Sequence, residues 1–274
     1  APGATAASAG TGAPGSGGDL ELRLRATVAG DELTLDFSGS APQHDGNLNC
    51  PLPVTLSACY FALRVLTDTD VPPSAGAYRP LTVEAPEGSL LNARSPAAVA
   101  AGNVETSSRV ADLVLDAFGR ALGQGTMNNL TLGNDDFTYY ETLGGGQGAC
   151  PDADGPGAVH VAMSNTLNTP VEALELEFPL RAVEYAVRRG SGGAGAHCGG
   201  DGVARELEAL DRMRYSLITE RRRNAPPGAD GGEEGAPGRN LLNGEELPAK
   251  ASGELNAGDR LRIETPGGGG HGKP

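Results

Sequence analysis

The side chains best suited to acid–base chemistry in this sequence are two glutamates, Glu105 and Glu141. Each stands beside glycine and other small residues, in the strings GNVET (102–106) and ETLGGG (141–146). A positioned carboxyl group transfers protons to or from a substrate, and small neighbours let that substrate approach. Both glutamates are therefore candidate catalytic residues. The alternative is a structural role, in which each carboxylate accepts hydrogen bonds from loop amides.

Glycine-rich polar strings recur along the chain, at residues 102–106, 124–129, 141–146, 188–193 and 265–270. Glycine loses more backbone entropy on folding than any other residue, so a cluster of glycines inside a domain needs a geometric reason. The strings differ from one another, unlike a repeated Gly/Ser linker. We expect them to be loops that line a shared site or interface, with turns and tight packing as the alternative for any single string.

The other reactive side chains form no recognisable catalytic or metal motif. No HExxH, GxSxG or GxxxxGK[ST] string is present, and the four histidines are far apart in the sequence. His160, with Asn165 and Asn168 nearby, is a candidate for orienting a substrate or for a satisfied structural position. The four cysteines form no CxxC pair, which favours free thiols in a cytoplasmic protein. We predict no metal site in this chain.

Composition excludes several function classes. The 274 residues carry a formal net charge of −14, which disfavours binding to nucleic acid or to anionic membranes. No segment approaches the ~18 uninterrupted apolar residues of a membrane-spanning helix. The first residues lack the basic and apolar regions of a secretory signal.

The elements that must position the candidate residues follow from hydrophobic periodicity. Alternation predicts a β-hairpin over residues 20–37 and recurs at 171–178, whereas helical spacing predicts amphipathic helices at 54–66 and 106–122. Short strands are predicted at 81–84, 159–163, 203–207 and 258–264. This mixture predicts an α+β fold, loop-rich, with antiparallel β-sheets and a few amphipathic helices. The low-complexity residues 1–18 predict a disordered tail, which leaves one domain over 19–274.

Taken in order, the strings resemble the hydantoinase B/5-oxoprolinase family. The resemblance extends from about residue 20 to the end and includes many colinear segments. These are DFSGS (36–40), GNLN (46–49), PEGSLLN (86–92), GNVETS (102–107), QGTMNN (124–129), YYETLGGG (139–146), NTLNTPVE (165–172), RRGSGGAG (188–195), GGDG (199–202), TERR (219–222) and TPGGGG (265–270). Near residue 160, relatives often read His-x-His-Met, whereas this chain reads His-Val-Ala-Met.

The resemblance implies part of an ATP-dependent hydrolase for cyclic amides such as hydantoins, 5-oxoproline or related lactams. In such systems, a hydantoinase A-type partner binds ATP and Mg, and a divalent metal lies in the N-terminal half of the family subunit. This chain resembles the C-terminal half only, and we expect it to act within a hetero-oligomer.

Under this hypothesis, particular residues of the strings are expected to meet the substrate. We expect Glu105 and Glu141 to be catalytic, and Asn103, Asn128, Asn129 and Arg189 to bind the substrate. The alternatives are a non-catalytic assembly module that binds the A-type subunit, or part of a related ketone carboxylase.

Overall fold

The structure is a computed structural model that describes residues 4–11, 20–67, 70–126 and 128–274. Contacts between Cα atoms divide the chain into two compact units, Ala1–Gly119 and Arg120–Pro274. The first unit contains one sheet and the second contains two. The single domain over 19–274 and the disordered tail over 1–18 stay predictions; in that tail, Ala4–Thr11 form a strand, and the other residues lie outside the described part of the chain.

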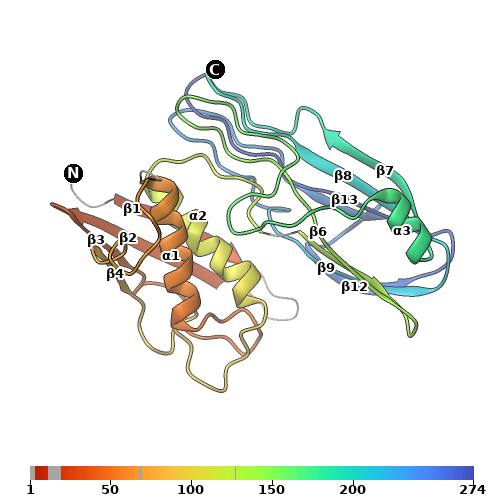
Figure 1. The fold of residues 1–274 in the computed structure, drawn as a ribbon, viewed down its shortest axis with the longest axis horizontal. Coiled ribbons are helices and arrows are strands. Elements are labelled where there is room, and N and C mark those ends of the chain that lie inside the picture. Colours follow the sequence, from red (N-terminus) through yellow and green to blue (C-terminus); the bar gives the residue numbers. More distant parts are fainter. Residues whose placement is uncertain (1–3, 12–19, 68–69, 127) are drawn as a thin grey trace. The chain divides into compact units, whose positions relative to one another are not determined.

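The first unit is a four-stranded sheet with helices on one face. Its strands are β1 (Ala4–Thr11), β2 (Leu20–Ala29), β3 (Glu32–Asp36) and β4 (Leu81–Glu84), in that order across the sheet. The first three strands are antiparallel, and β4 joins β3 in parallel. Helices α1 (Leu52–Leu66) and α2 (Ser107–Ala117) pack against each other, and α2 also packs on β1 and β2 (Figure 1).

The predicted hairpin 20–37 is confirmed, because alternate residues of β2 form a buried face. Leu22 and Leu24 of this face are nearly inaccessible to solvent, as is Leu35 of β3. The predicted helix 106–122 is shorter than expected: α2 ends at Ala117. Gly119, with a φ of 70°, adopts the left-handed conformation that commonly terminates helices.

The second unit is a β-sandwich of two sheets with a short helix. One sheet has the order β11-β10-β13-β8-β7, and the other has the order β12-β9-β5-β6. All neighbouring strands in both sheets are antiparallel. The elements are β5 (Asn129–Gly133), β6 (Thr138–Thr142), α3 (Val171–Glu177), β7 (Leu180–Arg188), β8 (Gly202–Ala209), β9 (Met213–Ile218), β10 (Arg239–Leu242), β11 (Glu245–Leu247), β12 (Lys250–Leu255) and β13 (Arg260–Glu264).

Apolar side chains from both sheets meet between them. Leu130 and Leu217 from one sheet and Leu207 and Ile263 from the other belong to one buried cluster. Burying such side chains contributes about 1.5–3 kcal/mol each, which makes this layer the main source of cohesion in the unit. The mixture of helices with antiparallel sheets in the two units confirms the predicted α+β class.

Most of the glycine strings of the second unit pack against one another. Residues 144–149, 155–157, 191–200, 228–235 and 266–270, here called the glycine bundle, lie outside the helices and strands. They run side by side near the C-terminus (Figure 1). Hydrogen bonds of 2.8–2.9 Å connect the backbones of Gln147, Gly200, Gly268 and Gly193 in turn.

The bundle requires glycine because its backbones touch. A Cβ atom on Gly268 would lie 1.9 Å from the carbonyl oxygen of Gln147, and one on Gly146 would lie 1.9 Å from that of Gly200. No side chain fits at such distances. The alternative, tight packing, is what the structure shows for these segments. A role of these strings in lining a site stays a prediction.

Two other expected elements differ in the structure. The segment 171–178, which alternates Leu and Glu, begins with helix α3 because Pro170 supplies a helix start and Leu174 packs inward. The predicted strand 159–163 is not a strand, and only Val159 makes a β-bridge, to Gly145. Short apolar runs fit helix and strand about equally well, so periodicity does not separate them.

Candidate functional site

Glu105 and Asn103 lie in one turn of π-helix, η1 (Gly102–Thr106), directly before α2. Glu105 is fully buried and Asn103 is exposed. The sequence predicted a polar loop here, so the local structure differs, because the turn continues into α2. Single π-turns are rare and are frequently found at functional sites.

A second string of the first unit fixes η1 in place. The Thr106 hydroxyl donates a 2.6 Å hydrogen bond to the carbonyl oxygen of Leu48. A Cβ atom on Gly102 would lie 2.0 Å from the carbonyl oxygen of Asn49. The GNLN string and the GNVETS string are therefore packed together, backbone against backbone.

Asn49 stabilises the loop that packs against η1. Its buried side-chain amide donates hydrogen bonds of 2.8–3.0 Å to the carbonyl oxygens of His44, Gly46 and Ala98. Its Oδ1 accepts a 2.8 Å hydrogen bond from the backbone N–H of His44. Asn49 thereby orders the loop 44–49, a role that the sequence analysis did not assign.

In the second unit, Asn128 is the centre of a buried polar network. Its Nδ2 donates a 2.9 Å hydrogen bond to Oε1 of Gln124, and its Oδ1 accepts one from Nη1 of Arg222. Nη2 of Arg222 donates a 2.8 Å hydrogen bond to Oδ1 of Asn240. The strings QGTMNN and TERR therefore meet in space. Met127 lies outside the described residues.

Backbone strain accompanies this network. Arg221 has a φ of 59°, in the left-handed region that costs an L-residue about 1–2 kcal/mol. Asn128, with a φ of 44°, lies in the same region, which asparagine adopts more readily. Strain of this kind persists only where surrounding contacts enforce it, and it concentrates at functional sites. Amide and guanidinium groups held in this way can orient a carbonyl or phosphoryl oxygen without reorganisation.

Glu141 occupies a different environment from the one the sequence predicted. It lies in strand β6 rather than in a polar loop, and its carboxylate is 3.2 Å from Nη2 of Arg205 on β8. The two side chains are 2% and 0% exposed. The Arg205 guanidinium also lies 4.5 Å from the ring centroid of Tyr185, a cation–π distance.

Burial has the largest effect on the pKa of Glu141. Removal from water raises its pKa above the ordinary value, although the Arg205 cation opposes the shift. Within the described residues, the Arg205 guanidinium donates no hydrogen bond. This arrangement is a buried ion pair between the two sheets.

The remaining predicted substrate residues are separated. Asn129 is buried on β5, where its Oδ1 accepts a 3.2 Å hydrogen bond from the Thr142 hydroxyl. Arg189 is exposed just after β7. Asn103 and Glu105 belong to the first unit, and the other four residues belong to the second. The structure thus places Asn128, Asn129 and Glu141 on or beside the β5–β6 hairpin, whereas Arg189 follows β7 of the other sheet.

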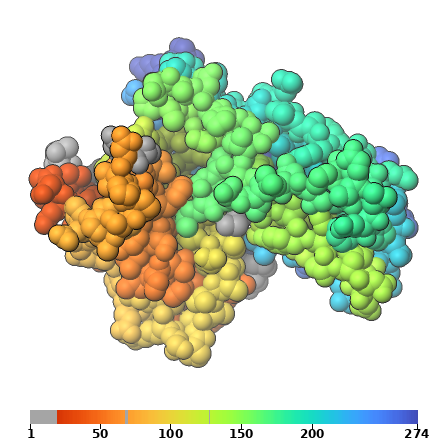
Figure 2. Space-filling view, in the orientation of Figure 1, coloured from red at the N-terminus to blue at the C-terminus, as the bar shows by residue number. Residues whose placement is uncertain are grey.

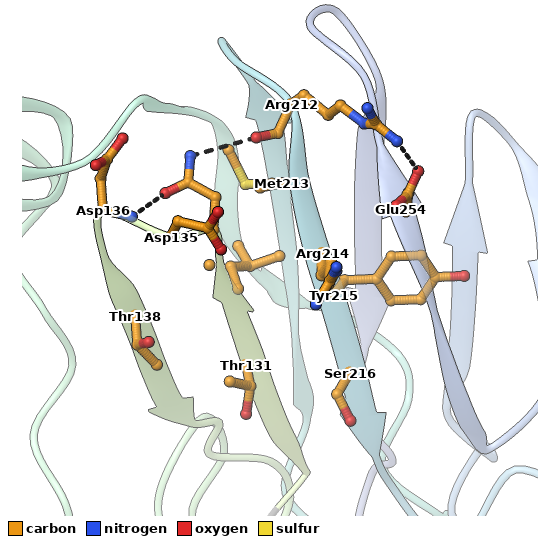
Figure 3. Close-up of a pocket in the computed structure, with 13 residues that line it drawn as sticks. Thr131, Asp135, Asp136, Thr138, Arg212, Met213, Arg214, Tyr215, Ser216 and Glu254 are labelled. Carbon is orange, nitrogen blue, oxygen red and sulfur yellow. Dashed lines mark hydrogen bonds and ion pairs between the residues drawn. The ribbon is translucent and has the colours of Figure 1, made fainter.

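A groove of about 670 Å³ covers the outer face of the sheet that contains β5, β6 and β9 (Figure 3). Thr131, Thr138 and Ser216 line it, and an ion pair of 2.6 Å joins Arg212 to Glu254 at one end. None of the residues predicted as catalytic or substrate-binding lines this groove. The Arg212–Glu254 pair is exposed, and Asp135 and Asp136 also line the groove.

Two further observations limit the chemistry of the described residues. They contain no group of three or more His, Cys, Asp and Glu side chains able to hold a metal ion. No helix among them is long and apolar enough to cross a membrane.

Comparison with solved structures shows which proteins share this fold. The fold is similar to the ATP-dependent caprolactamase from Pseudomonas jessenii, with a TM-score of 0.83 and 26% identity, over 99% of this chain and 52% of that one. It is also similar to acetone carboxylase in its nucleotide-free structure, with a TM-score of 0.74 and 16% identity, over 93% of this chain and 41% of that one; this second likeness concerns the fold alone.

The sequence comparison identifies the family. The chain belongs to the Hydantoinase B/oxoprolinase family, whose sequence model matches residues 5–274. It is 42% identical over 259 residues to 5-oxoprolinase 1 of Arabidopsis thaliana, which covers 92% of this chain and 20% of that protein. The chain therefore spans between a fifth and about half of the proteins it resembles. The family resemblance inferred from the strings is confirmed.

Proposed function

We propose that this chain is part of an ATP-dependent hydrolase of cyclic amides, acting on hydantoins, 5-oxoproline or related lactams. The observation that carries the proposal is the family match over residues 5–274, supported by the structural likeness to an ATP-dependent caprolactamase. The chemistry requires activation, because amide resonance makes the C–N bond planar and unreactive. Phosphorylation of the carbonyl oxygen weakens that resonance.

The ATP and metal functions belong elsewhere in the assembly. The sequence has no GxxxxGK[ST] phosphate loop, and the described residues offer no metal-ligand cluster. We therefore assign ATP and Mg to a hydantoinase A-type partner, and any divalent metal to another part of the enzyme. The unpaired cysteines fit a cytoplasmic enzyme.

Within this chain, we propose that the two polar clusters serve the substrate. Asn128 is proposed to act through its network: its buried amide is held by Gln124 and Arg222, which fixes the position of the Arg222 guanidinium beside it. Asn103 and Glu105 are proposed to orient the lactam or its phosphorylated form from η1. Asn129 and Arg189 stay proposed contacts, and for Glu141 we favour a positioning role through its ion pair with Arg205.

The direct test is lactam-dependent ATP hydrolysis by the assembled enzyme that contains this chain and an A-type partner. Glu105→Gln should lower kcat by 10²-fold or more if its carboxyl group transfers a proton. Glu87→Gln, in an exposed ion pair with Arg94, is the matched control and should leave kcat unchanged. Equal rates in both variants would remove Glu105 from the reaction.

A non-catalytic assembly module is a second candidate, and the glycine bundle favours it. Its strings are occupied by backbone contacts and leave no room for a ligand where they touch. Size-exclusion chromatography with the A-type partner separates the alternatives. A stable complex without lactam-dependent or ketone-dependent ATP hydrolysis would identify a module, whereas carboxylation of a ketone would identify a carboxylase.

A further inference from the structure

The segment around His160 is strained at both ends. Ala158 has a φ of 53° and Ala162 has a φ of 51°, so two alanines in the left-handed region bracket the histidine. Each costs about 1–2 kcal/mol relative to a right-handed conformation. Val159 anchors the segment, because it exchanges two hydrogen bonds of 2.8 and 2.9 Å with Gly145 of the glycine bundle. The position of His160 is therefore enforced by a rigid neighbour.

Three side chains form a directed hydrogen-bond chain in this segment. The Ser164 hydroxyl lies 3.0 Å from the carbonyl oxygen of Val161, to which it donates, and 3.2 Å from Nδ1 of His160. A hydroxyl group has only one proton to donate, so Ser164 must accept from His160, and Nδ1 carries the hydrogen. Nε2 then has a lone pair, which accepts from the Thr166 hydroxyl at 3.0 Å.

The protonation state of the His160 imidazole is the one that a general base requires. Burial lowers the pKa of His160, which favours the neutral ring at neutral pH. Thr166 is exposed, and so are its neighbours 165, 167 and 168. In the space-filling view, green segments of the second unit are visible at its surface (Figure 2). A hydroxyl open to solvent thus donates to a neutral base whose other nitrogen is oriented by a third group. This is the arrangement by which enzymes activate hydroxyl groups.

We propose that Thr166 and His160 form a catalytic proton relay that activates water in the cyclic-amide hydrolysis. The inference rests on the proposed function. Water transfers a proton to Oγ1 of Thr166 as the Thr166 proton moves to Nε2 of His160, and the water oxygen bonds to the activated carbonyl carbon. When the C–N bond of the ring breaks, the imidazolium returns its proton through Thr166 to the leaving nitrogen. The new hydroxyl becomes a carbonyl as its proton goes to solvent, which leaves an acyl phosphate. A second water molecule then splits the acyl phosphate into the carboxylate and inorganic phosphate, and the relay itself is back in its starting state.

The first test measures the tautomer and needs no turnover. Long-range ¹H–¹⁵N NMR of the full chain, with the His160 signals identified by their loss in His160→Gln, should show hydrogen on Nδ1 and not on Nε2. Ser164→Ala should shift the ring toward the other tautomer. Hydrogen on Nε2 in the unaltered chain would overturn the relay, because Thr166 would then have no base to donate to.

The second test is kinetic and uses the assembled enzyme. Thr166→Val removes the hydroxyl at nearly constant shape and should lower kcat 10²-fold or more with little change in KM, whereas Thr166→Ser should retain most of kcat. Leu167→Ala alters an adjacent residue that is 95% exposed and is the matched control, expected to be unchanged. Thermal unfolding of each variant should match the unaltered protein, since both positions are exposed.

The outcomes separate the two proposals. Unchanged kcat in Thr166→Val, beside an active unaltered enzyme, would overturn the relay alone. No lactam-dependent turnover in the unaltered enzyme would overturn the proposed function and the relay with it.

Discussion

The Glu141 carboxylate on β6 lies 3.2 Å from the Arg205 guanidinium on β8, so a charge pair connects the two sheets inside the sandwich. Both side chains are almost completely removed from water. Removing one partner of such a pair leaves an uncompensated buried charge. A loss of function in Glu141 variants must therefore be separated from a loss of stability.

We expect Glu141→Gln and Arg205→Met each to lower the free energy of unfolding by about 3–5 kcal/mol. The double variant should lose much less than the sum, because neither charge remains. Urea unfolding of the four proteins measures the coupling. Glu254→Gln, which breaks the exposed pair with Arg212, is the control and should leave the free energy of unfolding nearly unchanged. Additive losses in the double variant would show that the two side chains are independent.

Two glycines in one string should respond very differently to alanine. A Cβ atom on Gly192 would lie 1.9 Å from the carbonyl oxygen of Gly199, whereas one on Gly190 would meet nothing within 4 Å. Gly192→Ala must displace backbone and should unfold or severely destabilise the second unit. Gly190→Ala should lose only about 1–2 kcal/mol, from its φ of 78°. Thermal unfolding compares them, and similar midpoints would contradict the packing of the bundle.

The Asn128–Arg222 contact should appear as energetic coupling. Asn128→Ala leaves buried partners without a hydrogen bond, at a cost of about 1–3 kcal/mol, and Arg222→Ala should overlap with that loss. A double-mutant cycle by urea unfolding should give a coupling energy of about 0.5–3 kcal/mol. Arg223→Ala, at an exposed neighbouring position, is the comparison. Coupling near zero would mean that the contact contributes nothing measurable.

Thiol reactivity should separate the exposed Cys198 from the buried Cys50 and Cys59. Burial raises the pKa of Cys50 and that of Cys59 to about 12, while Cys198 is exposed. At pH 8, a thiol of this pKa is thiolate in about one molecule in ten thousand, and the thiolate is the reactive form. Labelling with a disulfide reagent should therefore modify Cys198 quickly, and Cys50 and Cys59 only on unfolding. Cys198→Ser should abolish the fast phase.

The same raised pKa values predict alkaline destabilisation. An unfolded thiol ionises near pH 8.5, whereas the folded Cys50 and Cys59 stay protonated until about pH 12. Their contribution to stability is therefore complete below about pH 8.5 and is lost as the pH rises toward 12. Urea unfolding of the Cys50→Ala, Cys59→Ala double variant should show a shallower decline over this range. An unchanged decline would mean that other groups govern it.

The sequence predicted those elements whose periodicity was long and one-sided. The hairpin of β2 and β3 and the helix α1 follow directly from their apolar faces. The sandwich of the second unit was mostly missed, because strands such as β10 and β11 span only four and three residues. Nothing local distinguishes strands this short from turns.

For the candidate site, the sequence identified the right strings but misjudged their surroundings. Glu141 and Asn128 were both selected beside glycines, yet one is in a buried ion pair and the other in a strained network. Their partners, Arg205 and Arg222, lie 64 and 94 positions along the chain from them. Long-range pairing of this kind leaves no trace in local spacing. The hydroxyl groups beside His160 are close in sequence, and the pattern H-x-x-x-S-x-T was the available signal.

The glycine bundle limits what can be inferred about activity from sequence similarity within this family. Where two backbone segments are in contact, glycine is required because a Cβ atom would clash with the neighbouring peptide group. The requirement does not depend on any reaction. Selection for a stable fold would retain these glycines even in a protein that had lost its catalytic activity. A relative can therefore keep every such string and still be inert, and activity has to be inferred from the few polar residues that the scaffold holds in place.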